Sequence, residues 1–224
     1  YDSTTKRVEA LNGSGKSSIK TDINKLEEIG LDSIPLDGQH SGLAVSVPGC
    51  VDAWDQLLEK YGAFSLDTVL APAVDYAQDG FGVSEITANS WKQSELKLSI
   101  NGNCEFLPAG RAPRFGEKVV LPQLCRTLKG ISENGRSFMY QGSVPEKISS
   151  YVNKFSGWLC EEDFAKHTCS WVKPISSNYR GYDVWECPPN GQGIAALIAL
   201  NIVENIDLVN SDINPVLQLH YKIE

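Results

Sequence analysis

The 224-residue sequence has no long apolar run, no excess of positive charge and only three histidines. No apolar segment reaches the ~18 residues that a membrane-spanning helix needs, and the first residues lack a signal-peptide pattern. The 20 basic residues are outnumbered by 28 acidic ones, for a formal net charge of −8, and they form no stripe interleaved with aromatic side chains. We therefore expect neither a membrane nor a nucleic acid as a partner.

The sequence contains cysteines but no Cys-x-x-Cys motif. The six cysteines are Cys50, Cys104, Cys125, Cys160, Cys169 and Cys187. At these distant positions, in a chain of this length, they indicate small buried side chains rather than a disulfide framework. The localisation stays open, with a reducing, cytoplasmic compartment favoured.

Two kinds of reactive site find little support in the sequence. The set of residues weighed as metal ligands is Cys160, His167, Cys169 and Cys187. Its spacings match no zinc pattern, so we expect no metal and no cofactor. His40 and Ser41 are adjacent in one loop and no Gly-x-Ser-x-Gly elbow exists, which disfavours a Ser/His/Asp triad.

Residues 10–17 read Ala-Leu-Asn-Gly-Ser-Gly-Lys-Ser and fit a relaxed phosphate-binding loop. Glycines would let backbone N–H groups face phosphate, and Lys16 would reach its oxygens. The strand of a phosphate-binding loop, however, is a buried apolar run, whereas residues 6–9 are mostly charged. No later apolar strand ends in a metal-holding aspartate. A flexible turn is favoured, and a nucleotide-binding protein is kept as an alternative.

Apolar periodicity predicts an α/β chain rich in helices. The clearest helix covers residues 51–61, with Val51, Trp54, Leu57, Leu58 and Tyr61 on one face. Other helices are expected at 19–29, 67–77, 84–101, 120–134, 144–155, from 161, at 194–205 and at 216–224. Strands are expected at 7–11, 43–47, 169–177 and 180–187. No repeat or linker marks a boundary, so residues 1–224 are expected to form a single domain segment.

Several segments combine parts of these elements with the turns that join them, and they have no obvious chemistry of their own. They are Val47-Pro48-Gly49-Cys50-Val51-Asp52-Ala53-Trp54, residues 70–83, Arg111-Ala112-Pro113-Arg114, residues 126–142, Glu162-Asp163-Phe164 and residues 179–193. In this order they resemble the large subunit of the γ-glutamyltranspeptidase (glutathione hydrolase) family, over nearly the whole chain from Tyr1.

This resemblance implies part of an N-terminal-nucleophile hydrolase, a four-layer αββα sandwich. In that family a precursor cuts itself, and the new N-terminal Thr of the small subunit becomes the nucleophile. Its α-amine, with a pKa near ~7.7–8.0, serves as the base. The resemblance therefore implies a small-subunit partner, an acyl amide substrate and no catalytic residue in this chain. It also implies that the sequence starts after the first portion of the large subunit and stops before its end.

The resemblance also implies a substrate-binding position. In the family an Arg just after the strand that corresponds to Val8–Leu11 holds the α-carboxylate of the γ-glutamyl group, and alignment places Ser14 there. Lys16 is the nearest cation. A charged Arg–carboxylate pair contributes about 1.5–3 kcal/mol, more than neutral hydrogen bonds to Ser. Ser14 in place of the family's Arg, and the sequence of the turn Pro188-Pro189-Asn190-Gly191, both resemble the acylase-like branch of the family.

Ser14 and Lys16 are therefore the predicted substrate-binding residues. The favoured activity is that of an amide hydrolase or acyl transferase acting on γ-glutamyl or related acyl amides. A catalytically inactive scaffold relative is the second alternative, beside the nucleotide-binding protein.

Overall fold

The computed structural model describes residues 1–100, 105–206, 214–216 and 219–220. The chain divides into two compact units, the first made of Tyr1–Gly15 with Thr168–Glu224 and the second of Lys16–His167. The expectation of a single domain segment over residues 1–224 stays a prediction. Among the described helices, none has the length and hydropathy of a membrane-crossing segment.

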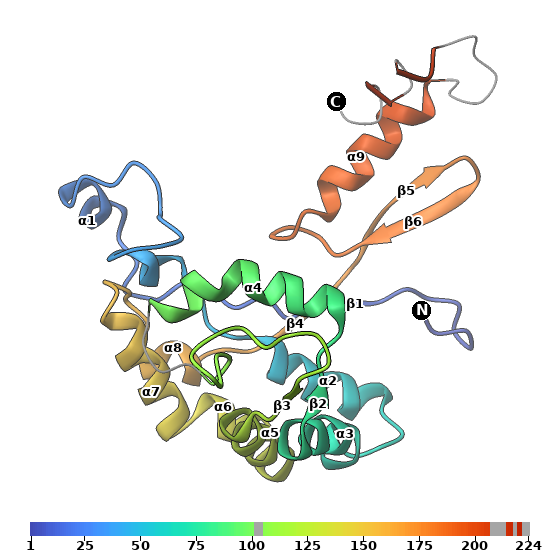
Figure 1. The fold of residues 1–224 in the computed structure, drawn as a ribbon. Helices are drawn as coiled ribbons and strands as arrows, with labels where there is room; N and C mark the ends of the chain where they lie inside the picture. Colours follow the sequence, from blue (N-terminus) through green and yellow to red (C-terminus); the bar gives the residue numbers. More distant parts are fainter. Residues whose placement is uncertain (101–104, 207–213, 217–218, 221–224) are drawn as a thin grey trace. The chain divides into compact units, whose positions relative to one another are not determined.

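The second unit is mainly helical (Figure 1). Its helices are α1 (Ile23–Glu28), α2 (Cys50–Tyr61), α3 (Leu66–Asp79), α4 (Glu85–Ser99), α5 (Pro122–Asn134), α6 (Arg136–Tyr140), α7 (Ser143–Asn153) and α8 (Glu161–Ala165), with a 3-10 turn at Ser41–Ala44. A short antiparallel pair joins β2 (Phe81–Gly82) to β3 (Lys118–Val119). Gly80, at φ +88°, ends α3 where a side chain would meet the Val119 carbonyl at 2.7 Å, so the sharp exit into β2 requires glycine.

Two apolar clusters form the core of this unit. One is built from the segments before α2 and α8 and from α2, α3, α5, α6, α7 and α8, and includes Val47, Val51, Leu70, Ile131, Tyr140, Val152, Leu159 and Phe164. The other lies around the β2–β3 pair and includes Ala77, Val83, Ala88, Val119, Leu121 and Cys125. Helices α3 and α5 run side by side and contribute to both clusters (Figure 1).

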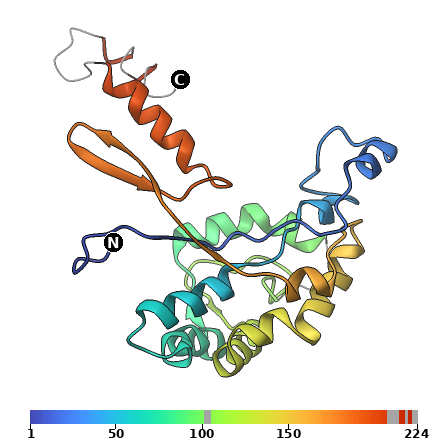
Figure 2. The same cartoon turned by 180° about the vertical axis from the view of Figure 1, so that it is seen from behind.

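The first unit contains β1 (Ala10–Asn12), β4 (Ser170–Val172), the hairpin β5 (Ile175–Tyr179) and β6 (Tyr182–Glu186), and α9 (Gly193–Glu204). β1 pairs antiparallel with β4, with Leu11 opposite Trp171. The view from behind shows the dark-blue N-terminal segment running beside the orange segment that leads into the hairpin (Figure 2). Arg180 and Gly181 both have positive φ at the hairpin turn, as a two-residue type I′ turn requires. The hairpin packs on α9, and the Arg180 N–H donates to the Glu204 carboxylate at 3.1 Å (Figure 1).

The predicted class, α/β and rich in helices, is confirmed, and most helices lie where periodicity placed them. The strand expected at 43–47 is wrong, because residues 41–44 form a 3-10 turn. The first helix begins at Ile23 rather than at residue 19, since Asp22 caps it. The strand expected at 169–177 is two strands, interrupted next to Pro174, which has no N–H to donate. The helix expected at 216–224 lies largely outside the described residues.

Candidate substrate-binding turn and a buried polar cluster

The turn that follows β1 is held by the side chain of Asn12. Its carbonyl oxygen accepts the Ser14 N–H at 3.0 Å, and its amide donates to the Asn190 side chain at 3.1 Å. The turn at 12–14 therefore contacts the turn after β6, although 178 residues separate the two asparagines. Ser14 is exposed, and its hydroxyl has no hydrogen-bond partner among the described residues. Its hydroxyl is thus available to a ligand.

Lys16 opens the second unit with a fixed backbone and an exposed side chain. Its carbonyl accepts the Val47 N–H at 3.0 Å. Within the described ranges its ammonium has neither an ion pair nor a hydrogen bond. Because Ser14 belongs to the first unit and Lys16 to the second, a common site for their side chains stays a prediction.

The same turn lacks the geometry of a phosphate-binding loop. Such a loop leads directly into a helix whose N-terminal N–H groups and dipole hold the phosphate. After Lys16, however, the chain makes a turn at Ser18–Thr21, and α1 begins only at Ile23 behind the acidic cap Asp22. β1 also pairs antiparallel with β4. The local structure therefore does not support the nucleotide-binding alternative.

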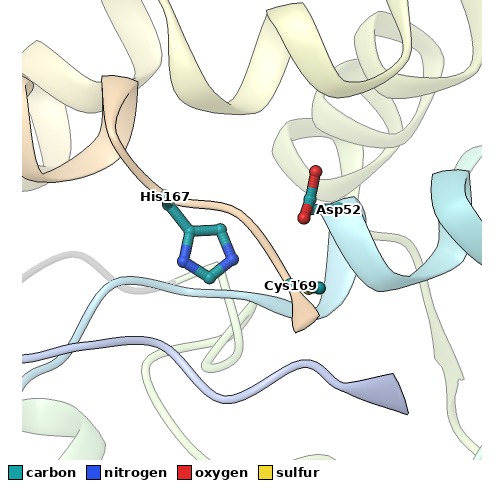
Figure 3. Close-up of side chains that lie close together, drawn as sticks. All are labelled: Asp52, His167 and Cys169. Carbon is teal, nitrogen blue, oxygen red and sulfur yellow. The ribbon is translucent and has the colours of Figure 1, made fainter. Parts of the chain in front are cut away.

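Sequence reasoning missed a buried polar cluster in the second unit. Asp52, on the first turn of α2, is 1% exposed. Its carboxylate accepts hydrogen bonds from the Arg136 guanidinium and, at 2.9 Å, from the Gln56 amide. The same guanidinium donates to the His167 carbonyl. Asp52 and His167 come from α2 and from the segment after α8 (Figure 3).

Tyr140 connects this cluster to the start of α2. Its hydroxyl donates to the Pro48 carbonyl at 2.7 Å and accepts the Asp52 N–H at 3.1 Å. Gly49, the residue before α2, has no side chain that could cap the helix, so the Tyr140 hydroxyl satisfies one of its free N–H groups. The turn at 47–50 is thereby fixed by a residue about 90 positions later.

His167 stacks on Tyr140, with ring centroids 5.1 Å apart. Burial lowers the pKa of His167, while Asp52 and a hydrogen bond with the Gly49 backbone oppose this, and the charges of Arg136 and Lys16 lower the pKa further. The pKa lies below its ordinary value, which favours the neutral imidazole. The cluster is thus built to order the turn before α2.

Two of the residues weighed earlier for metal or nucleophilic chemistry, Cys160 and Ser41, make hydrogen bonds of another kind. The Cys160 thiol donates to Asp163 at 3.4 Å, whereas Cys169 and Cys187 belong to the first unit. Ser41 donates to the Gly38 carbonyl at 2.8 Å rather than to its neighbour His40. Ser41 and His40 are therefore not arranged as a nucleophile and its base.

The class of protein follows from solved structures. The chain matches a cephalosporin acylase from Bacillus halodurans at TM-score 0.85 and 35% identity, over 97% of this chain and 41% of that one. It matches a γ-glutamyltranspeptidase from Helicobacter pylori at TM-score 0.82 and 30% identity, over 96% of this chain and 63% of that one. These likenesses define an N-terminal-nucleophile hydrolase fold.

Sequence comparison specifies the family. The gamma-glutamyltranspeptidase family model matches residues 1–224, so the chain belongs to this family and the resemblance is confirmed. The chain is 42% identical, over 207 residues, to a glutathione hydrolase-like YwrD proenzyme of Bacillus subtilis (strain 168), and 35% identical, over 172 residues, to the glutathione hydrolase proenzyme of Escherichia coli (strain K12). The matches cover 91% and 75% of this chain but 38% and 30% of those relatives.

Proposed function

We propose that residues 1–224 are the non-nucleophilic, large-subunit part of an amide hydrolase or acyl transferase that acts on γ-glutamyl or related acyl amides. In the intact protein they form a single domain segment. The observation that carries the proposal is the family match over every residue of the chain. The names of the relatives, which include glutathione hydrolases and an acylase, support both the amide substrate and the proenzyme character.

The chemistry of this proposal belongs to a small subunit of the same precursor. The hydroxyl of its N-terminal Thr attacks the amide carbonyl, and its α-amine takes the hydroxyl proton and returns a proton to the leaving amine. Water then completes hydrolysis of the acyl-enzyme, or a second amine completes transfer. The present chain contributes the surface that holds the acyl group and positions the small subunit.

Exposed apolar side chains support a large protein partner. Helix α9 is apolar nearly all round, yet Ile194, Ile198 and Ile202 are 43%, 52% and 60% exposed. On α2, Trp54 and Leu57 from the predicted apolar face are 38% and 43% exposed. A helix with apolar residues on all sides is typical of a protein interior. We infer that the small subunit of the same precursor covers exposed apolar side chains of each unit.

The acyl tail, in this proposal, is read by Ser14 and Lys16. Both side chains are exposed and without partners in the described part of the chain. An ammonium is a compact charge that lacks the fork of a guanidinium, so it places a carboxylate less strictly. We therefore propose that the site accepts glutaryl and related acyl groups beside γ-glutamyl ones.

Two substitutions test this reading in the processed protein. Lys16→Ala should raise KM for a glutaryl anilide by about two- to fivefold, the range of an exposed ion pair, and leave a neutral acyl anilide unchanged. Ser14→Arg should shift preference toward γ-glutamyl anilide. Lys20→Ala, an exposed lysine four residues away, is the control. Unchanged kinetics of both test variants on both donors would remove Ser14 and Lys16 from the substrate site.

The proposed activity is tested by comparing the isolated chain with its precursor. Residues 1–224 alone should release no aniline from γ-glutamyl or glutaryl anilides, whereas the processed precursor should turn over at least one of them. Turnover by the pure isolated chain would place the nucleophile within it and contradict the proposal. An inert processed precursor would support the scaffold alternative.

A further inference from the structure

The segment that follows Lys16 is anchored to the second unit by three hydrogen bonds. The Lys16 carbonyl accepts the Val47 N–H at 3.0 Å, and the Ser18 hydroxyl donates to the Trp158 carbonyl at 2.7 Å. The Ile19 N–H donates to the Asp163 carboxylate at 2.7 Å. The Ser18 side chain is buried as well. A short segment with no helix or strand of its own is thus held at residues 16, 18 and 19.

Asp163 uses both carboxylate oxygens in this arrangement. Oδ1 accepts the Ile19 N–H, while Oδ2 accepts the Cys160 N–H at 2.8 Å and the Cys160 thiol at 3.4 Å. Asp163 is 6% exposed, so these hydrogen bonds replace water around the charge. One side chain therefore caps the start of α8 and also holds residue 19, 144 positions earlier in the chain.

The ionised form of Asp163 suits this double role. Burial alone would raise the pKa of Asp163, but hydrogen bonds from Ile19 and Cys160 bring the pKa below its ordinary value. A carboxylate can accept on both sides, whereas an asparagine side chain offers one oxygen and one N–H₂ donor. The N–H₂ group of an asparagine at position 163 would face the N–H of either Ile19 or Cys160, and two donors cannot form a hydrogen bond with each other. Asparagine therefore cannot replace aspartate here.

We propose that Asp163 is a positioning residue for substrate recognition: it fixes the backbone of residues 16–19 and thereby sets where the Lys16 ammonium meets an acidic acyl group. The inference rests on the proposed function and adds to it a residue that does not touch substrate. Only Ser17 and Ser18 separate Ile19 from Lys16, whose own carbonyl accepts the Val47 N–H. Loosening the Ile19 end should therefore broaden the positions that the ammonium can take.

A double-mutant cycle in the intact processed protein tests this inference. The variants are Asp163→Asn, Lys16→Ala and the double variant, assayed on glutaryl anilide and on neutral pentanoyl anilide. Asp163→Asn should raise KM for glutaryl anilide about two- to fivefold, an increase no larger than that caused by Lys16→Ala. The kcat for this donor and the KM for the neutral donor should stay nearly unchanged. In the Lys16→Ala background the same substitution should change KM for neither donor.

Glu162→Gln is the matched control. Glu162 also carries a carboxylate on α8, but it is exposed and pairs with Lys166 at the surface. This substitution should leave both donors unchanged. Trypsin gives a readout that is independent of activity: Asp163→Asn should speed cleavage after Lys16 and Lys20, and Glu162→Gln should not.

The possible results separate this inference from the proposed function. Equal changes for acidic and neutral donors, or additive effects of Asp163→Asn and Lys16→Ala, would overturn the positioning role while leaving the amidase activity in place. A processed parent protein that cleaves neither donor would overturn the proposed function itself, and with it the role of Asp163 in recognition.

Discussion

At the scale of single residues, the buried carboxylate of Asp52 is bound by residues that lie far from it in the sequence. Its partners include Arg136, 84 positions later, while Tyr140, 88 positions later, binds its backbone. The sequence placed Asp52 on the first turn of a helix, but its burial depends on contacts that periodicity does not report. Ser14 and Lys16 are predicted as substrate-binding residues only because the resemblance to a family pointed to their positions, and they stay a prediction.

Removal of Arg136 should destabilise the protein strongly. Arg136→Met keeps much of the side-chain volume but leaves the Asp52 carboxylate, 1% exposed, without its cation. A buried charge without its partner typically costs about 3–5 kcal/mol in the free energy of unfolding. Urea unfolding of the intact protein measures this, with Arg126→Met, an exposed arginine on α5, as the control.

The rescue variant makes this prediction specific. Asp52→Asn in the Arg136→Met background removes the unpaired charge and should recover part of the lost free energy of unfolding. If Arg136→Met unfolds at the same urea concentration as Arg126→Met, the pair does not stabilise the turn before α2.

At the scale of elements, the break between α5 and α6 explains why periodicity missed α6. Gly135, at φ +56°, ends α5, and α6 starts at the next residue in a new direction. Phe138 of α6 then packs on the face of Gly130, where a Cβ would lie 2.2 Å from its ring. A five-residue helix is too short to show a period, so the helix depends on contacts such as this one and the burial of Tyr140, which the sequence pattern does not report.

Gly130→Ala should therefore lower stability although alanine favours helices. Its methyl group would collide with the Phe138 ring, and overpacking of this kind costs about 1–3 kcal/mol, against a gain of up to about 1 kcal/mol in helix propensity. Urea unfolding should show a net loss that Gly130→Ala with Phe138→Leu partly restores. A stabilised single variant would mean that the ring moves aside freely.

The loop before β3 supplies a prediction on pH. Arg111 donates to both Glu117 oxygens, at 3.0 and 2.8 Å, and the Arg114 N–H donates at 2.9 Å. The Arg111 hydrogen bonds, followed by that of Arg114, lower the pKa of Glu117 from 4.5 to about 2. Since the folded state favours the ionised form, this contribution is fully present above about pH 4.5 and is lost as pH falls toward 2.

Thermal unfolding of the intact protein between pH 6 and pH 2.5 tests this pair. The parent should lose more of its Tm over this range than Glu117→Gln, whose side chain does not titrate. Glu133→Gln, at an exposed position on α5, should follow the parent. Parallel curves for the parent and Glu117→Gln would show that the loop does not depend on the ionised pair.

The elements themselves were predictable where their pattern was long. Helices α2, α3, α5 and α7 show clear apolar periodicity over at least 11 residues each, and the structure confirms them. The strand expected at 43–47 is wrong because a run of five mostly apolar residues is too short to distinguish a strand from a 3-10 turn. The backbone of this segment is held by residues distant in the sequence, as in the hydrogen bond from the Val47 N–H to the Lys16 carbonyl.

At the scale of the whole molecule, the chain is one part of a larger family architecture. It spans 38% and 30% of the two proenzyme relatives, and its family model covers all 224 residues. Composition and periodicity predicted a helix-rich α/β chain, whereas the family and its fold were predicted from the resemblance. Neither the sequence pattern nor the resemblance predicted the contact between the turns at Asn12 and Asn190.

The most direct test of the proposed function is the fate of the complete precursor. Purified precursor should convert, without added protease, into two chains, and N-terminal sequencing of the smaller chain should read Thr at its first position. Replacement of that Thr by Ala should prevent both cleavage and hydrolysis of γ-glutamyl or glutaryl anilides. A precursor that hydrolyses these amides while uncleaved, or whose activity survives the replacement, would contradict the proposal that residues 1–224 serve a separate Thr nucleophile.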